Sequence, residues 1–246
     1  MRSNHFGERL NMNGDLGQAD LAVIAELCGN RLKYGAKTIL KPERGSPPSF
    51  PVILSGWAAR YQILRNGSRQ ITGVLLPGDA CHFDAWPREC ELEEIITLCP
   101  CTVVFVPCHT LDRLIETRPG IARALRHYAR LESAVLASWV INNGRRDALE
   151  RMAHFISEAH ARLAVIGATS HGRFHFPMTQ EDFADVVGLT PVHINRKLQQ
   201  LRREGVITLR GKDLTILKRQ SLEQIGGFES SYLYPRRVEQ TMLAAA

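Results

Sequence analysis

Residues 179–207 decide the fold, and they read TQEDFADVVGLTPVHINRKLQQLRREGVI. Thr179 is a good N-cap, and Asp182 stands three residues later, where the reciprocal partner of a capping box belongs. Gly188 suits a tight turn because glycine accepts a positive φ without strain. The stretch therefore predicts a short helix that ends in a glycine turn and leads into a second helix.

The second helix has a clear start and a two-faced pattern. Thr190 is a suitable N-cap, and Pro191 fits the first helical position, where its missing N–H is not needed. Ile194, Leu198 and Leu201 are spaced i, i+4 and i+7, which predicts one buried stripe. The remaining face is polar, rich in hydrogen-bond donors and free of acidic residues. Such a face fits a DNA major groove, which is lined by base edges and phosphates.

A basic hairpin follows this helix. Residues 206–209 and 214–217 look like two strands around Arg210-Gly211-Lys212-Asp213, which predicts a wing on the DNA backbone. From Thr190 to Arg219 there are eight basic and two acidic residues, an excess that equals the net charge of +6 of the whole chain. Charge alone would also fit a solvated basic surface. Together with the two capped helices and the hairpin, it indicates phosphate binding.

The same residues resemble the winged helix–turn–helix of the Crp/Fnr bacterial transcription regulators. Residues 180–185, 188–196 and 201–207 carry this resemblance. Residues 54–58 and 75–79 look like the strand–turn signatures of that family's cyclic-nucleotide-binding-like β-barrel. The resemblance implies a sequence-specific regulator that binds an inverted-repeat operator as a homodimer. The implied partners are double-stranded DNA, a second copy of the chain and RNA polymerase.

The resemblance also assigns roles by position. Arg196 matches the family arginine that binds a guanine by two hydrogen bonds, and Thr190 and Glu181 stand where the family contacts or approaches phosphates. Val192 replaces a glutamate that in many members accepts a hydrogen bond from a base, so we expect a different operator, with Val192 favouring a thymine methyl. The expected DNA-binding residues are Gln180, Glu181, Thr190, Pro191, Val192, His193, Asn195, Arg196, Gln199, Arg203, Arg210 and Lys212.

The N-terminal half has the pattern of a small antiparallel barrel. Short β-like runs are broken by Gly and Pro, and Asn66-Gly67 between two such runs is a strong hairpin signal. The predicted strands include 52–54, 58–64, 70–76 and 101–106. The expected fold class is therefore α+β: an N-terminal antiparallel, jelly-roll-like β-barrel, a long dimerisation helix and a C-terminal winged helix–turn–helix.

A long helix is predicted after Pro119-Gly120, because apolar residues recur there with alternating spacings of three and four. Leu125, Leu136, Trp139 and Val140 form a neighbouring stripe, so one stripe can pack on the barrel and the other on a twin. A helix of the chain's own core is the alternative. Asn142-Asn143-Gly144 is the expected hinge. The residues predicted to form the dimer interface are Ile121, Ala124, Tyr128, Leu131, Val135, Ser138 and Asn142.

These patterns divide the chain into five parts. We expect a mobile arm at 1–20, the barrel at 21–118, the dimerisation helix at 119–143, the winged helix–turn–helix at 147–220 and a tail without an assigned role at 221–246. No apolar run reaches the roughly 18 residues of a membrane-spanning helix, and the N-terminus lacks the apolar block of a signal peptide. A cytoplasmic protein is expected.

The sequence does not favour a bound cofactor or metal. At the positions where the resemblance places an arginine and a hydroxyl for a cyclic phosphate, this chain has Glu93-Glu94, whose charges would repel the phosphate. Arg88 enters such a site only if the loop rearranges. An iron–sulfur cluster needs four thiolates, and the N-terminal segment supplies only Cys28. We therefore expect no cofactor.

The six cysteines are expected to be free thiols. Cys99 and Cys101 should face one side of a strand; joined by Cys81 or Cys90 they would make a zinc site, although buried apolar thiols are the simpler interpretation. Haem ligation by Cys81-His82 and a thiol switch are further options. A regulator gated by a ligand, haem, metal or thiols thus stays open as an alternative.

An enzyme is not expected. The chain contains no Gly-x-Ser-x-Gly, P-loop or His-Glu-x-x-His motif, and no His-x-His pair of the kind that a barrel metalloenzyme needs. A barrel metalloenzyme with an appended interaction domain is therefore the disfavoured alternative.

Overall fold

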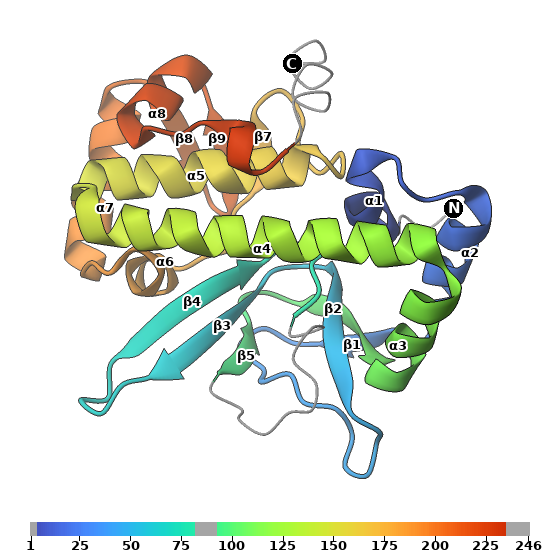
Figure 1. The fold of residues 1–246 in the computed structure, drawn as a ribbon. Coiled ribbons are helices and arrows are strands. Elements are labelled where there is room, and N and C mark those ends of the chain that lie inside the picture. The colour runs from blue at the N-terminus through green and yellow to red at the C-terminus, as the bar shows by residue number, and fades with distance from the viewer. Residues whose placement is uncertain (1–3, 82–92, 235–246) are drawn as a thin grey trace. The chain divides into compact units, whose positions relative to one another are not determined.

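The computed structural model describes residues 4–81 and 93–234, which form two compact units (Figure 1). The first unit contains the residues before Leu64 together with Thr72–Glu132. The second contains Leu64–Ile71 and the residues from Ser133 onward. None of the helices in the described ranges is both long enough and apolar enough to cross a membrane.

The first unit is built on two three-stranded sheets with the strand orders β1-β6-β2 and β4-β3-β5 (Figure 1). The first sheet is antiparallel, with Phe50 opposite Val106, and Phe50, Val52 and Val104 are buried in its core. This confirms the predicted β-rich N-terminal domain. The strands are β1 Leu32–Tyr34, β2 Ser49–Ser55, β3 Ala58–Ile63, β4 Arg69–Leu75, β5 Glu94–Thr97 and β6 Cys101–Pro107.

The N-terminal segment is folded from residue 4 onward, so the prediction of a mobile arm is wrong for residues 4–20. It forms α1 (His5–Leu10), a 3-10 turn η1 (Asn11–Asn13) and α2 (Gln18–Leu27). Phe6 and Leu10 lie one helical turn apart and are buried in the core of the first unit. The Nε of buried Arg9 lies 3.2 Å from a carboxylate oxygen of Asp79. Six residues carry too little pattern to reveal that such a helix is buried.

Two helices follow β6: α3 (Cys108–Thr117) and the long α4 (Pro119–Arg145). The first half of α4 closes the core of the first unit, because Ile121, Ala124 and Tyr128 are all buried in it. The hydroxyl of Tyr128 accepts a hydrogen bond of 2.9 Å from the backbone N–H of Ala80. The expected hinge at 142–144 is absent, since α4 continues without a break through these residues.

The second unit contains a helix–turn–helix and a small sheet of strand order β7-β9-β8, which confirms the predicted winged fold (Figure 1). Phe155, Phe176 and Phe183 form its aromatic centre. The ring centroid of Phe183 lies 5.3 Å from that of Phe155 and 5.4 Å from that of Phe176. The elements are α5 Ala148–Ala164, β7 Arg173–His175, α6 Gln180–Val187, α7 Pro191–Arg203, β8 Ile207–Arg210, β9 Asp213–Ile216, α8 Arg219–Gly226 and the 3-10 turn η2 Ser230–Tyr232.

Residues 221–234, expected as part of a tail, belong to this fold. Leu222, Phe228, Leu233 and Tyr234 are buried. The C-terminal part of the winged unit therefore extends beyond the predicted boundary at residue 220.

Candidate nucleic-acid interface

Helix α6 begins with the predicted capping box. The Thr179 hydroxyl accepts from the backbone N–H of Asp182 at 3.0 Å, and the Asp182 carboxylate accepts from the Thr179 N–H at 3.1 Å. Gly188 ends the helix in the left-handed region with a φ of 63°. These contacts fix the angle at which the chain leaves α6 and enters α7.

Two residues that the sequence analysis missed also hold α6. Asn143 donates from its side-chain amide to the carbonyl of Val186 at 3.2 Å, and Arg151 donates to the carbonyl of Val187 at 3.1 Å. Both bonds satisfy carbonyls at the C-terminal end of α6, which have no partner within the helix. No local sequence signal connects residues 143 and 151 with 186 and 187, so this contact needs the structure.

Helix α7 begins and packs as predicted. Thr190 is the N-cap, and its hydroxyl accepts from the His193 backbone N–H at 3.3 Å. Ile194 and Leu201 are fully buried, and Leu198 is 7% exposed. Full burial of such side chains stabilises a helix position by roughly 1.5–3 kcal/mol each. The helix is thus held rigidly by one face.

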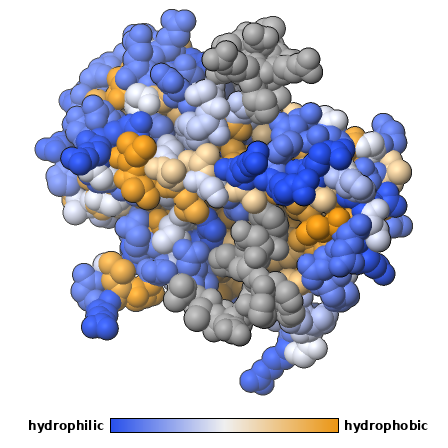
Figure 2. Space-filling view, in the orientation of Figure 1, coloured by the Kyte–Doolittle hydropathy of each residue, from blue (hydrophilic) through white to orange (hydrophobic). Residues whose placement is uncertain are grey.

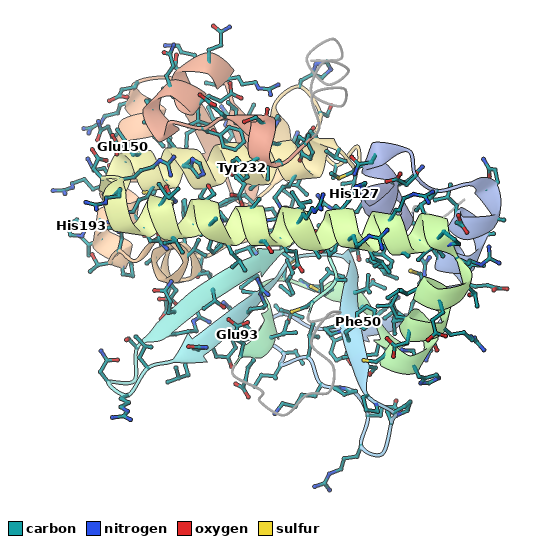
Figure 3. All side chains as sticks on the ribbon, in the orientation of Figure 1. Phe50, Glu93, His127, Glu150, His193 and Tyr232 are labelled. Atoms are coloured by element: carbon teal, nitrogen blue, oxygen red, sulfur yellow. The ribbon has the colours of Figure 1, made fainter. Side chains whose placement is uncertain are left out.

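The opposite face of α7 is open to solvent. Val192 is 77% exposed, and Arg196 is also exposed; no carboxylate in the described part of the chain forms an ion pair with its guanidinium. His193 lies on the outside of the helix (Figure 3). Asn195 is half-buried, and its amide oxygen accepts from Gln199 Nε2 at 2.9 Å. Together with exposed Pro191, Gln199 and Arg203, this face offers several cationic and amide donors to one ligand surface.

The wing carries two exposed cations. Strands β8 and β9 pair antiparallel with Arg210 opposite Asp213, and Gly211 has a φ of 60° at the turn. Arg210 and Lys212 are exposed, as are Gln180 and Glu181 at the start of α6. Gln180, Arg210 and Lys212 are donors of the type that binds phosphate oxygens.

The comparisons with known proteins agree with this geometry. Residues 150–225 match the Crp-like helix-turn-helix domain, and residues 31–118 match the cyclic nucleotide-binding domain. The transcriptional activatory protein AadR of Rhodopseudomonas palustris is 30% identical over 197 residues, which are 80% of each chain. The chain belongs to the Crp/Fnr family of transcription regulators.

Other members of the Crp/Fnr family show the same relationship. The nitrogen fixation regulation protein FixK of Bradyrhizobium diazoefficiens is 28% identical over 85% of this chain and 87% of its own. The fumarate and nitrate reduction regulatory protein of Escherichia coli is 29% identical over 73% of this chain and 71% of its own. The solved structure of FixK2 from Bradyrhizobium japonicum superposes with a TM-score of 0.71 at 23% identity, over 81% of this chain and 98% of that one. This family consists of DNA-binding transcription regulators and not of enzymes.

The two glutamates that stand in place of a phosphate-binding pair, Glu93 and Glu94, contact neighbouring side chains. The Glu94 carboxylate accepts from the Tyr61 hydroxyl at 2.5 Å, and Glu93 lies 3.8 Å from the Nε of Arg60. Arg88, Cys90 and His82 lie outside the described residues. Within the described ranges, no three side chains of His, Cys, Asp or Glu are grouped so as to hold a metal ion.

Cys99 and Cys101 lie close together, but not on one strand as predicted: Cys99 lies in the turn between β5 and β6, and Cys101 is the first residue of β6. The sulfur of Cys99 accepts from the Trp57 backbone N–H at 3.2 Å, and the Cys101 thiol donates to the Trp57 carbonyl at 3.2 Å. The hydrogen bond with Cys99 and the burial of both groups raise the pKa of the Cys101 thiol. A protonated, buried thiol is a poor nucleophile. The five cysteines in the described residues are free thiols.

The residues predicted to form the dimer interface are buried to different degrees within the single chain. Ile121, Ala124 and Tyr128 fill the chain's own core, and Asn142 is buried, so these four side chains are closed to a second copy. Ser138 bonds to His154 within the chain, and Leu131 and Val135 are half-buried. The two stripes of the helix have the same spacing, and spacing alone does not identify which of them the core covers.

The apolar surface that α4 leaves open lies elsewhere on the helix. Leu136, Val140 and Ile141 are 41%, 74% and 55% exposed. Figure 2 shows a hydrophobic area over the C-terminal half of α4 and a hydrophilic one over its N-terminal half. The N-terminal part of the same face carries exposed Arg123, Arg126 and Arg130.

Proposed function

We propose that this regulator binds an inverted-repeat operator as a homodimer and inserts one α7 into each of two successive major grooves. The observation that carries the proposal is the exposed donor face of α7, built on a fully buried apolar stripe. Two-fold symmetry then requires half-sites about one helical turn apart, roughly 34–36 Å between centres. The cytoplasm is the expected place of action, and RNA polymerase is the expected second partner.

Base recognition is assigned to the exposed residues of α7. Arg196 donates two hydrogen bonds to the O6 and N7 of a guanine, and Val192 packs on a thymine methyl. His193, Asn195 and Gln199 face the neighbouring base pairs. Exposure of Val192 and the absence of an ion pair on Arg196 within the described residues support this assignment.

Phosphate contacts surround this helix. Thr190 and Pro191 lie at the N-terminus of α7, where the positive end of the helix dipole attracts anions. Gln180 and Glu181 border the phosphates at the start of α6, Arg203 lies at the other end of α7, and Arg210 and Lys212 extend from the wing. These contacts position the protein without selecting a sequence.

The dimer contact is assigned to the exposed apolar face of α4. Leu136, Val140 and Ile141 lie within about one and a half turns of the helix, so they form one continuous patch. A patch of this kind on a long helix pairs well with its symmetry copy. This assignment replaces the dimer interface predicted from the sequence, because the first three of its residues, Ile121, Ala124 and Tyr128, lie in the core.

Selection from a pool of random duplexes tests the proposal. We expect enrichment of an inverted repeat with a guanine in each half-site. The variant Arg196→Ala, selected in parallel, should lose the preference at that guanine and keep the rest of the site. Enrichment of single, non-repeated sites, or of no site, would contradict the proposal.

A further inference from the structure

The junction between α4 and α5 is short and closely bonded. Only Arg146 and Asp147 separate the two helices. The side-chain amide of Asn142 donates to the Arg151 carbonyl at 3.2 Å, and Arg151 Nε donates to the Arg146 carbonyl at 2.8 Å. Asp147 caps α5 in a reciprocal box with Glu150. Hydrogen bonds on both sides of the turn therefore restrain the angle between α4 and α5, unlike in a flexible hinge.

A group of polar residues, some buried and some half-buried, connects the two helices that meet at this junction, and we call it the brace. Its members come from three segments: α4, α5 and the C-terminal turn η2, from which Tyr232 contacts α5 (Figure 3). The brace consists of Ser138, Trp139, His154, Glu158, Arg162 and Tyr232. All six belong to the second unit.

Glu158 is the centre of the brace. Its side chain is fully buried, and it accepts from Trp139 Nε1 at 3.1 and 3.3 Å, from the Tyr232 hydroxyl at 2.8 Å and from Arg162 at 3.4 Å. A buried carboxylate costs several kcal/mol unless donors surround it. Since these donors come from three segments, the cost is offset only when α4, α5 and η2 keep this arrangement.

His154 makes a second set of contacts one turn earlier on α5. Its Nε2 lies 2.9 Å from the Ser138 hydroxyl, and its Nδ1 lies 3.1 Å from the Gly226 carbonyl. The imidazole stacks on the Tyr232 ring with centroids 6.3 Å apart and 6° between the planes. A side chain at Gly226 would begin 2.4 Å from the His154 backbone nitrogen, so the end of α8 lies directly against α5.

The same turns of α4 have two different faces. Trp139 and Asn142 point into the brace and the junction, whereas Val140 and Ile141 are exposed. If a second copy docks on this exposed face, the contact is linked to α5 through the hydrogen bonds of Trp139 and Asn142 on the opposite face of the same turns. Apolar residues of similar volume would stabilise this interior at least as well as a buried ion pair. They would define the angle between α4 and α5 less well, because they make no directional hydrogen bonds.

We propose that Glu158, Trp139 and Tyr232 are positioning residues: they fix the direction of α5 and its DNA-binding helices relative to α4, and thereby set the half-site spacing that the dimer accepts. This inference rests on the proposed function, because spacing has a meaning only for a dimer on a two-part operator. It assigns to these three residues no contact with DNA.

The test compares spacing selectivity with base selectivity. Binding is measured on the selected operator, on versions with two base pairs added or removed between half-sites, and on a version with one substituted base in each half-site. We expect the wild-type protein to prefer the native spacing roughly tenfold or more. Glu158→Gln and Tyr232→Phe should each reduce this preference at least roughly threefold, with the base preference unchanged.

Tyr61→Phe is the matched control, because it also removes a tyrosine hydroxyl that donates to a carboxylate, but in the first unit. It should keep both preferences. A brace variant that is less stable to heat and yet keeps the wild-type spacing preference would overturn the inference. If Glu158→Gln does not fold, the milder Tyr232→Phe decides.

The two proposals fail in different ways. A wild-type protein that binds no duplex selectively, or ignores spacing, contradicts the proposed function, and the positioning role falls with it. A wild-type protein that discriminates spacing, alongside brace variants that discriminate equally well, contradicts the positioning role alone.

Discussion

Helices α7 and α4 show two different relations between sequence and structure. In α7, the cap, the first residue and the buried stripe all lie where the sequence places them. In α4, the helix exists as predicted, but the first three residues assigned to a twin, Ile121, Ala124 and Tyr128, are buried in the chain's own core. The start and the buried face of α7 follow from residues within the helix itself. In α4, the sequence does not show which apolar face packs on the chain's own core and which is left for a partner.

The contrast shows what an apolar period can and cannot tell. A helix with one apolar face can pack in only one way, because its polar face must be exposed to solvent. A helix with two apolar faces can pack in two ways, which differ in which face lies on the chain's own core and which on a second copy. The following four predictions test this contrast, in order of decreasing effect.

The largest effect is expected from the exposed face of α4. The double variant Leu136→Glu, Val140→Glu places two like charges on the proposed contact and should convert the dimer to monomer at micromolar concentration. The measurement is sedimentation velocity, together with binding to the selected operator, which should weaken in parallel.

Ile121→Ala is the contrasting variant, since Ile121 is 1% exposed in the core. It should lower the free energy of unfolding by about 2–5 kcal/mol and leave the dissociation of the folded dimer unchanged. Dissociation of the dimer by Ile121→Ala, but not by the charged variant, would instead support the dimer interface predicted from the sequence.

The second prediction concerns pH and the packing of the winged unit. Burial lowers the pKa of His154 from 6.5 to about 4, so the folded state resists protonation more than the unfolded state. Stability should therefore fall as pH drops from 6.5 toward 4, by about 3 kcal/mol from this group. Denaturant unfolding at several pH values measures it.

His154→Gln serves as the reference in that experiment. It keeps a polar side chain but cannot titrate, so the difference between the two pH profiles isolates His154. Subtraction is needed because burial raises the pKa of Glu158, which acts in the opposite direction in acid. Identical profiles would show that the pKa of His154 is the same in the folded and unfolded states, and would contradict the prediction.

The third prediction tests the open face of α7. Arg196→Ala should weaken operator binding by about 1–3 kcal/mol and relax the preference at one base pair per half-site. Arg196→Lys, which keeps the charge without the two-pronged geometry, should recover only part of the affinity. Equal losses on operator and random DNA would instead indicate a phosphate contact.

The smallest effect is expected from the wing. Lys212→Ala should lower affinity by less than about 1 kcal/mol, evenly on all sequences, and reduce the slope of log affinity against log salt by about one. Salt titrations on operator and random duplexes measure it. A loss confined to the operator would contradict the wing's assignment to the backbone.

The parts of the fold that the sequence predicts are those with local signals. Caps and glycine turns marked α6, α7 and the wing, and the Asn66-Gly67 turn marked the hairpin of β3 and β4. Helix α1 was missed because the burial of Phe6 depends on strands far along the chain. Asn142-Asn143-Gly144 looked like a helix end, yet Asn142 and Asn143 are held by Arg151 and Val186.

The functional residues also fall into those that the sequence predicts and those that it does not. The base-facing side of α7 follows from residue order alone, since burial of Ile194 and Leu201 leaves only one face for a ligand. The brace does not follow, because Glu158 and Tyr232 are 74 positions apart and neither belongs to a motif. Such a contact becomes visible only when the helices are packed.

The most direct test of base recognition by α7 removes single atoms from DNA. Each guanine of the selected half-site is replaced in turn by 7-deazaguanine, which lacks the N7 acceptor, and binding of the wild-type protein and of Arg196→Ala is compared. At one guanine, the wild type should lose about 1 kcal/mol or more while Arg196→Ala loses nothing further. Equal losses for both proteins at every guanine, or no loss at any, would contradict the claim that Arg196 recognises a base.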